Sequence, residues 1–138
     1  MRASGSIRLT FDGGSRGNPG PAYGSFRVHG AGAASRLRAL RRLRFAQGTN
    51  NEAEYWSLLA GLRWTLKEAR RHRLSPADLD LTAQGDSLLV IRQLDGAWKA
   101  RDGRMRVLRD EVLSLLGQFR AVHLRHRPRE HSVAEFGH

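Results

Sequence analysis

The sequence has no cysteine, no long hydrophobic run and few acidic residues. Without cysteine there is no disulfide, no thiolate-bound zinc and no cysteine nucleophile. No stretch approaches the roughly 18 apolar residues of a membrane-spanning helix, and residues 1–5 lack the apolar core of a signal peptide. We therefore expect a cytoplasmic protein with no membrane partner. A chain of 138 residues predicts a single domain over 1–138.

Basic residues greatly outnumber acidic ones. There are 24 lysines and arginines against 13 aspartates and glutamates, a formal net charge of +11. A small domain this basic attracts polyanions, and nucleic acid is the commonest of them. Almost all of the basic residues are arginine, which suits bidentate contacts with phosphate. The same excess could also serve solubility alone, so the positions of the few acids become decisive.

Hydrophobic periodicity predicts alternating strands and helices. Period-two alternation predicts strands at 6–12, 22–29 and 36–45, separated by a turn-rich stretch at 13–21 and a glycine-containing hairpin at 30–33. Helical spacing predicts a long helix at about 50–70, which Thr49 and Glu52 would open as a capping box. A strand at 78–84, a short helix at about 86–96, a helix through 105–119 and a strand at 122–126 follow.

The order of these elements is βββαβααβ, which indicates an α/β fold. Three consecutive strands with short connections predict an antiparallel meander. The strand after the long helix is expected to lie parallel to the first strand, because the helix provides the crossover. We therefore expect one five-stranded mixed sheet with helices on its faces.

Three acids follow or flank predicted elements in a way that could bring them together. Asp12 ends the first strand, Glu54 lies near the start of the long helix, and Asp86 follows the fourth strand. If the first and fourth strands are neighbours, the three carboxylates converge and repel one another unless divalent cations neutralise them. Oxygen ligands select Mg²⁺ or Mn²⁺. The alternative is three separate surface acids, with Asp86 acting as a helix N-cap.

Three motifs, in order and in register, resemble those of type 1 ribonucleases H. Residues 12–21 (DGGSRGNPGP) resemble the family's opening motif, and residues 49–54 (TNNEAE) resemble its helix-start motif T-N-N-x-x-E. Residues 85–87 (GDS), with Val90, Gln93 and Leu94, resemble its third motif. Residues 96–99 (GAWK) are similar to a segment that often follows. The resemblance covers about residues 6 to 100 and implies the ribonuclease H-like fold.

The resemblance also implies roles for individual residues. Asp12, Glu54 and Asp86 would hold two divalent ions, Mg²⁺ or Mn²⁺, that catalyse phosphodiester hydrolysis. The residues expected along the RNA strand, where amides and exposed backbone can meet a 2′-hydroxyl, are Gly14, Ser15, Asn18, Asn50, Asn51 and Ser87. Those expected to hold the DNA strand are Trp98, Lys99 and Arg101. Asn50 and Asn51 could equally be plain helix-start residues, and Trp98 could be a core residue.

The resemblance weakens in the tail. The family carries a fourth acid, an Asp, near the start of a C-terminal helix, and here that helix is largely missing and no Asp occurs after Asp110. Glu135 is the nearest candidate for the fourth ligand, with a register one residue short, and Glu130 is a poorer one. The alternative is a site of three acids and a histidine. His126 and His131 are placed to assist proton transfer, or are ordinary polar surface residues.

The activity that the resemblance implies is that of a monomeric endoribonuclease. It would hydrolyse the RNA strand of RNA–DNA hybrids and leave 5′-phosphate and 3′-hydroxyl ends. Two alternatives stay open. One is a nucleic-acid-binding module on the same fold with weakened catalysis, and the other is a nuclease that acts on a different duplex.

Overall fold

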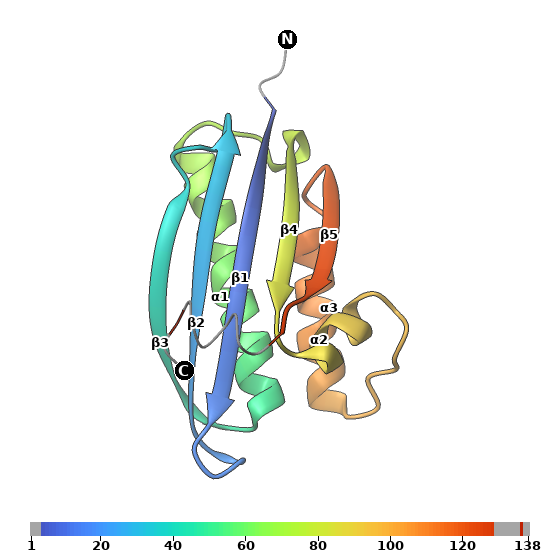
Figure 1. Ribbon diagram of the computed structural model, residues 1–138. Coiled ribbons are helices and arrows are strands. Elements are labelled where there is room, and N and C mark those ends of the chain that lie inside the picture. Colours follow the sequence, from blue (N-terminus) through green and yellow to red (C-terminus); the bar gives the residue numbers. More distant parts are fainter. Residues whose placement is uncertain (1–3, 129–135, 137–138) are drawn as a thin grey trace.

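A computed structural model of the protein describes residues 4–128 and 136, and its backbone forms one sheet with helices packed against it (Figure 1). The elements follow the predicted order βββαβααβ, with one turn of 3₁₀ helix, Pro76–Asp78, added before the fourth strand. Their bounds are β1 Gly5–Ser15, β2 Gly20–Gly32, β3 Arg38–Gly48, α1 Asn50–Arg71, β4 Leu79–Gly85, α2 Leu88–Leu94, α3 Gly103–Leu116 and β5 Ala121–His126.

The sheet has the strand order β3-β2-β1-β4-β5. Strands β1, β2 and β3 form the predicted antiparallel meander. Strand β4 runs parallel to β1, as predicted, because α1 carries the chain back along the sheet before β4 begins. The pairing of β1 with β4 ends at the end of β4, where Phe11 lies opposite Gly85, and β1 continues beyond it. Asp12 and Asp86 are the residues that follow this last pair.

The prediction of irregular structure over 13–21 was wrong for most of that stretch. Strand β1 continues to Ser15, strand β2 begins at Gly20, and Gly13 and Gly14 pair with Gly24 and Tyr23. The glycine at position 13 serves close packing: a Cβ there would lie 2.5 Å from the backbone carbonyl of Ala53 in α1. Glycine in this strand thus marks the approach of a helix, which composition alone does not distinguish from a turn.

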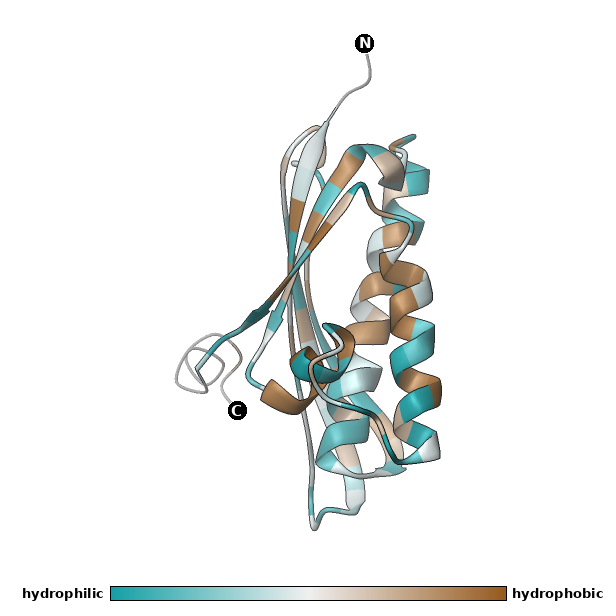
Figure 2. Ribbon diagram, turned by 90° about the vertical axis from the view of Figure 1, so that its right-hand side faces the viewer, coloured by the Kyte–Doolittle hydropathy of each residue, from teal (hydrophilic) through white to brown (hydrophobic). Residues whose placement is uncertain are grey.

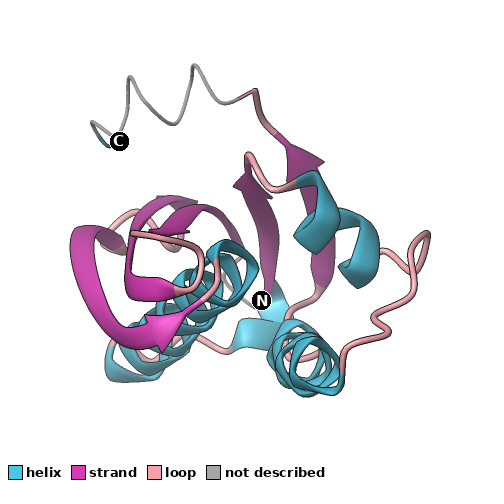
Figure 3. Ribbon diagram, turned by 90° about the horizontal axis from the view of Figure 1, so that it is seen from below, coloured by secondary structure: helices cyan, strands magenta, loops and turns pink. Residues whose placement is uncertain are grey.

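The hydrophobic core fills the space between the sheet and the two long helices, α1 and α3 (Figure 2). Seen from below, the strands form one layer and these helices a second (Figure 3). Every second side chain of β1, namely Ile7, Leu9 and Phe11, points into this space. There they belong to the same core cluster as the apolar side chains of α1. The fully buried members of the core include Leu9, Phe11, Leu37, Tyr55, Leu58, Leu62, Leu79, Leu81 and Val90.

Neither long helix covers the opposite face of the sheet, and this face is basic. Alternation along β3 directs Arg38, Arg42 and Arg44 to it. The carbonyl oxygen of the buried Phe136 accepts a hydrogen bond of 3.0 Å from Arg42 Nη1. Within the part of the chain that the structure describes, no helix is both long enough and apolar enough to cross a membrane.

Candidate metal centre

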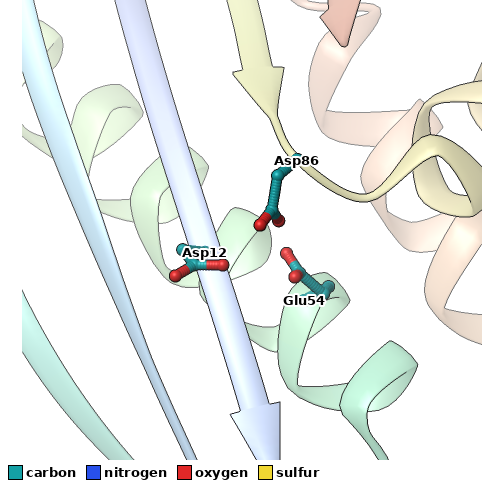
Figure 4. A group of neighbouring side chains, drawn as sticks. All are labelled: Asp12, Glu54 and Asp86. Atoms are coloured by element: carbon teal, nitrogen blue, oxygen red, sulfur yellow. The ribbon is translucent and has the colours of Figure 1, made fainter. Parts of the chain in front are cut away.

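Three acidic side chains, from β1, from α1 and from the connection after β4, meet where the pairing of β1 with β4 ends (Figure 4). Asp12 belongs to β1, Glu54 to α1, and Asp86 follows β4. Each offers a carboxylate oxygen that lies within 4.8 Å of those of the other two. Asp12 and Glu54 are buried, and Asp86 is half-buried. The convergence predicted from strand order is therefore confirmed.

The three carboxylates make a site that favours a cation. Burial, together with the charges of Asp12 and Asp86, raises the pKa of Glu54 well above its ordinary value, and the backbone N–H of Gly13 opposes this by hydrogen bonding to the carboxylate. One oxygen of Glu54, Oε2, is buried and has no hydrogen-bond partner among the described residues. A buried anion in this setting is stabilised by a divalent ion, and three carboxylates are the oxygen ligands that Mg²⁺ and Mn²⁺ take.

The alternative role of Asp86 as a helix N-cap does not hold. Ser87 is the N-cap of α2, and its hydroxyl oxygen accepts a hydrogen bond of 3.2 Å from the backbone N–H of Val90. Asp86 is left to face Asp12 and Glu54. The capping box predicted for α1 is present: Thr49 Oγ1 accepts from the N–H of Glu52, and Glu52 Oε1 accepts from the N–H of Thr49.

Hydrogen bonds tie the loop after β1 to the start of α1. Asn50 Oδ1 accepts from the backbone N–H of Ser15 at 2.8 Å, and Asn18 Oδ1 accepts from the backbone N–H of Asn50 at 2.9 Å. The hydroxyl of Ser15 donates to the carbonyl of Gly48 at 2.6 Å. Asn18 and Asn50 thus have structural roles, and each keeps its NH₂ group as a donor. Both side chains, like that of Asn51, are exposed.

The carboxylates line a cleft of about 300 Å³ that we call the acidic cleft. Four of the residues predicted to contact substrate lie in its wall: Gly14, Asn50, Asn51 and Ser87. Tyr23 also lines it, and sequence reasoning missed this residue. Tyr23 pairs with Gly14 across β1 and β2, and a Cβ at Gly14 would lie 2.5 Å from the Tyr23 hydroxyl. Glycine at position 14 therefore keeps room for this ring.

A second cleft, of about 450 Å³, adjoins the first and shares Asn51 with it. Asn18, Lys99 and Arg101 line it. So do Thr49 and Gln93, which lie in two of the motifs but were assigned no substrate contact, and Arg104 and Met105, which no motif pointed to. The second cleft thus joins residues predicted for the RNA strand to residues predicted for the DNA strand. Trp98 is 46% exposed, so its alternative role as a core residue is wrong, although it does not line either cleft.

Of the predicted histidines and candidate fourth acids, only His126 lies within the described part of the chain. His126, at the end of β5, lies beside the centre: its Nε2 is 3.1 Å from the carbonyl oxygen of Asp86. His131, Glu130 and Glu135 fall outside the described residues. Their assignments stay predictions.

Comparison with known proteins agrees with this geometry. A family model described as reverse transcriptase-like matches residues 42–134. The crystal structure of ribonuclease H1 from Halobacterium salinarum superposes with a TM-score of 0.75 at 33% identity, covering 91% of this chain and 88% of that one. The N-terminal ribonuclease H domain of Rv2228c from Mycobacterium tuberculosis gives a TM-score of 0.80 at 31% identity, covering 95% and 88%. The chain belongs to the type 1 ribonuclease H family.

The type 1 ribonuclease H relatives in curated collections are longer than this chain. Ribonuclease HI of Halobacterium salinarum is 37% identical over 129 residues, which are 91% of this chain and 58% of that protein. The bifunctional protein Rv2228c is 35% identical over 124 residues, 89% of this chain but 31% of its own length. The similarity to the mycobacterial protein is therefore to one domain of it.

Proposed function

We propose that this protein hydrolyses the RNA strand of RNA–DNA hybrids and leaves 5′-phosphate and 3′-hydroxyl ends, acting as a monomer. The observation that carries the proposal is the convergence of Asp12, Glu54 and Asp86 within 4.8 Å in a chain of net charge +11. A buried acidic centre surrounded by basic surface suits a phosphodiester, which needs cations at the reacting group and arginines along the backbone. Similarity to proteins named ribonuclease HI and ribonuclease H1 supports the choice of substrate.

The three carboxylates would hold two divalent ions, Mg²⁺ or Mn²⁺. Bound there, such ions supply an activated water and stabilise the leaving oxygen of the phosphodiester. The protein's own contribution is to hold the three ligands in place, because Asp12 and Glu54 lie on packed elements and Asp86 directly follows β4. Glu135 is our proposed fourth ligand, and His131 or His126 would assist proton transfer.

The side chains that surround the acidic cleft would recognise the RNA strand. Asn50 and Asn18 each present a free NH₂ group as donor, because their carbonyl oxygens already accept backbone hydrogen bonds. Asn51 is exposed between the two clefts and offers both a donor and an acceptor. A 2′-hydroxyl can meet either kind of group, and this distinguishes RNA from DNA. Trp98, Lys99 and Arg101 would hold the DNA strand on the far side.

The decisive experiment compares matched duplexes. The protein is incubated with RNA–DNA, RNA–RNA and DNA–DNA duplexes of one sequence, in Mg²⁺, Mn²⁺ or chelator. We expect cleavage of the RNA strand of the hybrid alone, only with metal, and its loss in Asp12→Asn. Asp110→Asn removes an exposed acid of α3 that lines neither cleft, and should keep full activity. Tight binding of hybrid without cleavage would instead favour a weakened binding module, and cutting of another duplex would favour a different nuclease.

The tail assignments need their own variants. If Glu135 is the fourth ligand, Glu135→Gln should lower the rate and weaken metal dependence, whereas Glu130→Gln should not. Replacing His131 or His126 by Ala should lower the rate without changing hybrid binding if either moves a proton. Unchanged activity in Glu135→Gln would show that this acid holds no metal.

A further inference from the structure

A hollow of about 490 Å³ lies beside the acidic cleft, and its rim carries three arginines. Its walls are Arg16 from the connection between β1 and β2, and Tyr23, Gly24, Ser25, Arg42, Leu43 and Arg44 from β2 and β3. We call it the arginine hollow. It opens on the face of the sheet away from the helices: Gly24 points toward α1, where Ser57 fills the space, so its neighbours Tyr23 and Ser25 point to the opposite side.

No acid among the described residues forms an ion pair with an arginine of the hollow. Arg16 and Arg44 are exposed and form no ion pair with any described residue. Arg42 donates one hydrogen bond, to the carbonyl of Phe136, which leaves its charge uncompensated. By contrast, Arg120 forms two hydrogen bonds with the carboxylate of Asp80. Three guanidinium groups around one hollow, none of them bound to a carboxylate of the described chain, make a site for an anion with several oxygens.

The arginine hollow and the acidic cleft are neighbours. Tyr23 lines both. In the sheet, Asp12 pairs with Ser25, and Ser25 pairs with Arg42. Arg42 therefore lies two strand spacings from Asp12, about 10 Å across the sheet. A chain molecule whose reacting phosphate lies at the carboxylates can reach the hollow with a phosphate further along the same molecule.

We propose that the arginine hollow binds backbone phosphates of the nucleic acid where it extends past the acidic cleft, with Arg16, Arg42 and Arg44 as the phosphate ligands. The proposal rests on the proposed function for the identity of the nucleic acid. It adds a contact on the sheet face, separate from the second cleft that Lys99 and Arg101 line. A polyanion with regularly spaced phosphates is complementary to this row of uncompensated charges.

The test measures the salt dependence of binding in chelator, so that no cleavage occurs. Each phosphate contact contributes a slope of about 0.9 to the decrease of log K with log salt on a duplex. We expect the double variant R16Q/R44Q to lose about 1.5 to 2 from this slope on an RNA–DNA hybrid. Neither of these arginines has a hydrogen bond to another described side chain, so folding should be unaffected, which a thermal melt checks.

The control removes the same charge elsewhere. R36Q/R70Q also loses two exposed arginines, one in the turn before β3 and one at the end of α1, and should keep the slope within about 0.5 because long-range charge alone is screened. A single R42Q should reduce the slope by about 1. Equal slopes in R16Q/R44Q and R36Q/R70Q would overturn the proposal. Because binding is read without metal, this result is independent of whether the protein cleaves hybrid, which the duplex comparison tests.

Discussion

Glu54 is the residue at which the requirements of folding and of metal binding conflict. Its carboxylate is buried beside two like charges, and its Oε2 has no hydrogen-bond partner in the described chain. Glu54→Gln should therefore abolish metal-dependent cleavage and, in chelator at neutral pH, raise the stability of the protein. We expect a gain on the order of 1 kcal/mol, about 4 °C in Tm. Thermal melts of both proteins in chelator give the measurement, and an unchanged or lower Tm would contradict it.

The same residue predicts a pH dependence of stability. In the unfolded chain Glu54 loses its proton near the ordinary value of 4.5, whereas in the fold its pKa is well above that. Between these two values the unfolded state binds fewer protons than the folded state, so the free energy of unfolding falls as pH rises. The stability difference between Glu54→Gln and the parent should be small below about pH 4 and grow as pH rises above 4.5.

Gly13 tests the packing that brings β1 and α1 together. A methyl group there would lie 2.5 Å from the carbonyl of Ala53 and 2.7 Å from the N–H of Glu54, and both are backbone atoms that cannot rotate away. Gly13→Ala should destabilise the fold by about 1–3 kcal/mol and displace Glu54 from the other carboxylates. Gly103→Ala is the matched control, since its Cβ would meet only the far end of Arg106 at 3.8 Å. Gly13→Ala should therefore have a lower stability in chemical denaturation and a lower cleavage rate than Gly103→Ala.

At the scale of the element, the start of α1 supports both stability and recognition. Thr49 and Glu52 close a capping box there, with bonds of 3.1 and 3.0 Å. Thr49→Ala should cost about 1 kcal/mol of stability. It should also reduce activity, because Asn50, Asn51 and Glu54 depend on the position of this turn. Thr49→Ser keeps the accepting oxygen and should retain most of the stability and most of the activity. The denaturant midpoint measures the first and the cleavage rate the second. Equal losses in Thr49→Ala and Thr49→Ser would show that the hydroxyl does not stabilise this turn.

Periodic elements could be predicted from the sequence because one side of each is buried. The alternation along β3 and the helical row of α1 both report the face that meets the core, and β4 parallel to β1 follows from the helix between them. The stretch 13–21 was mispredicted because glycine has two physical uses. At Gly13 it permits contact with α1, and only the fold shows which use applies.

The three carboxylates of the site could be predicted for the same topological reason, whereas its other walls could not. Asp12, Glu54 and Asp86 each follow from strand order plus a motif. Tyr23 lies on a strand, like any half-buried aromatic residue, and only its pairing with Gly14 places it in the acidic cleft. Arg104 lines the second cleft from α3. No motif lies in this helix, so the position of Arg104 follows only from how α3 packs in the fold.

At the scale of the whole molecule, the candidate metal centre joins parts of the chain that are far apart in sequence. Residue 12 lies in the middle of the sheet, residue 54 in the helix layer, and residue 86 in the connection to α2. Repulsion between their carboxylates opposes the packing of the sheet against the helices at the point where the pairing of β1 with β4 ends. We therefore expect that bound divalent ions stabilise this part of the fold, in addition to the contacts that the chain makes with itself.

Metal binding should consequently stabilise the entire domain and not only the site. An ion that binds the folded state alone adds about 2.7 kcal/mol at a concentration one hundred times its Kd. We expect the Tm of the parent protein to rise with Mg²⁺ or Mn²⁺, by about 8–10 °C at that ratio for a domain of this size. Asp12→Asn should show little of this rise, whereas Asp110→Asn should show all of it. A rise of equal size in Asp12→Asn would mean that the ions act on the protein somewhere other than these three carboxylates.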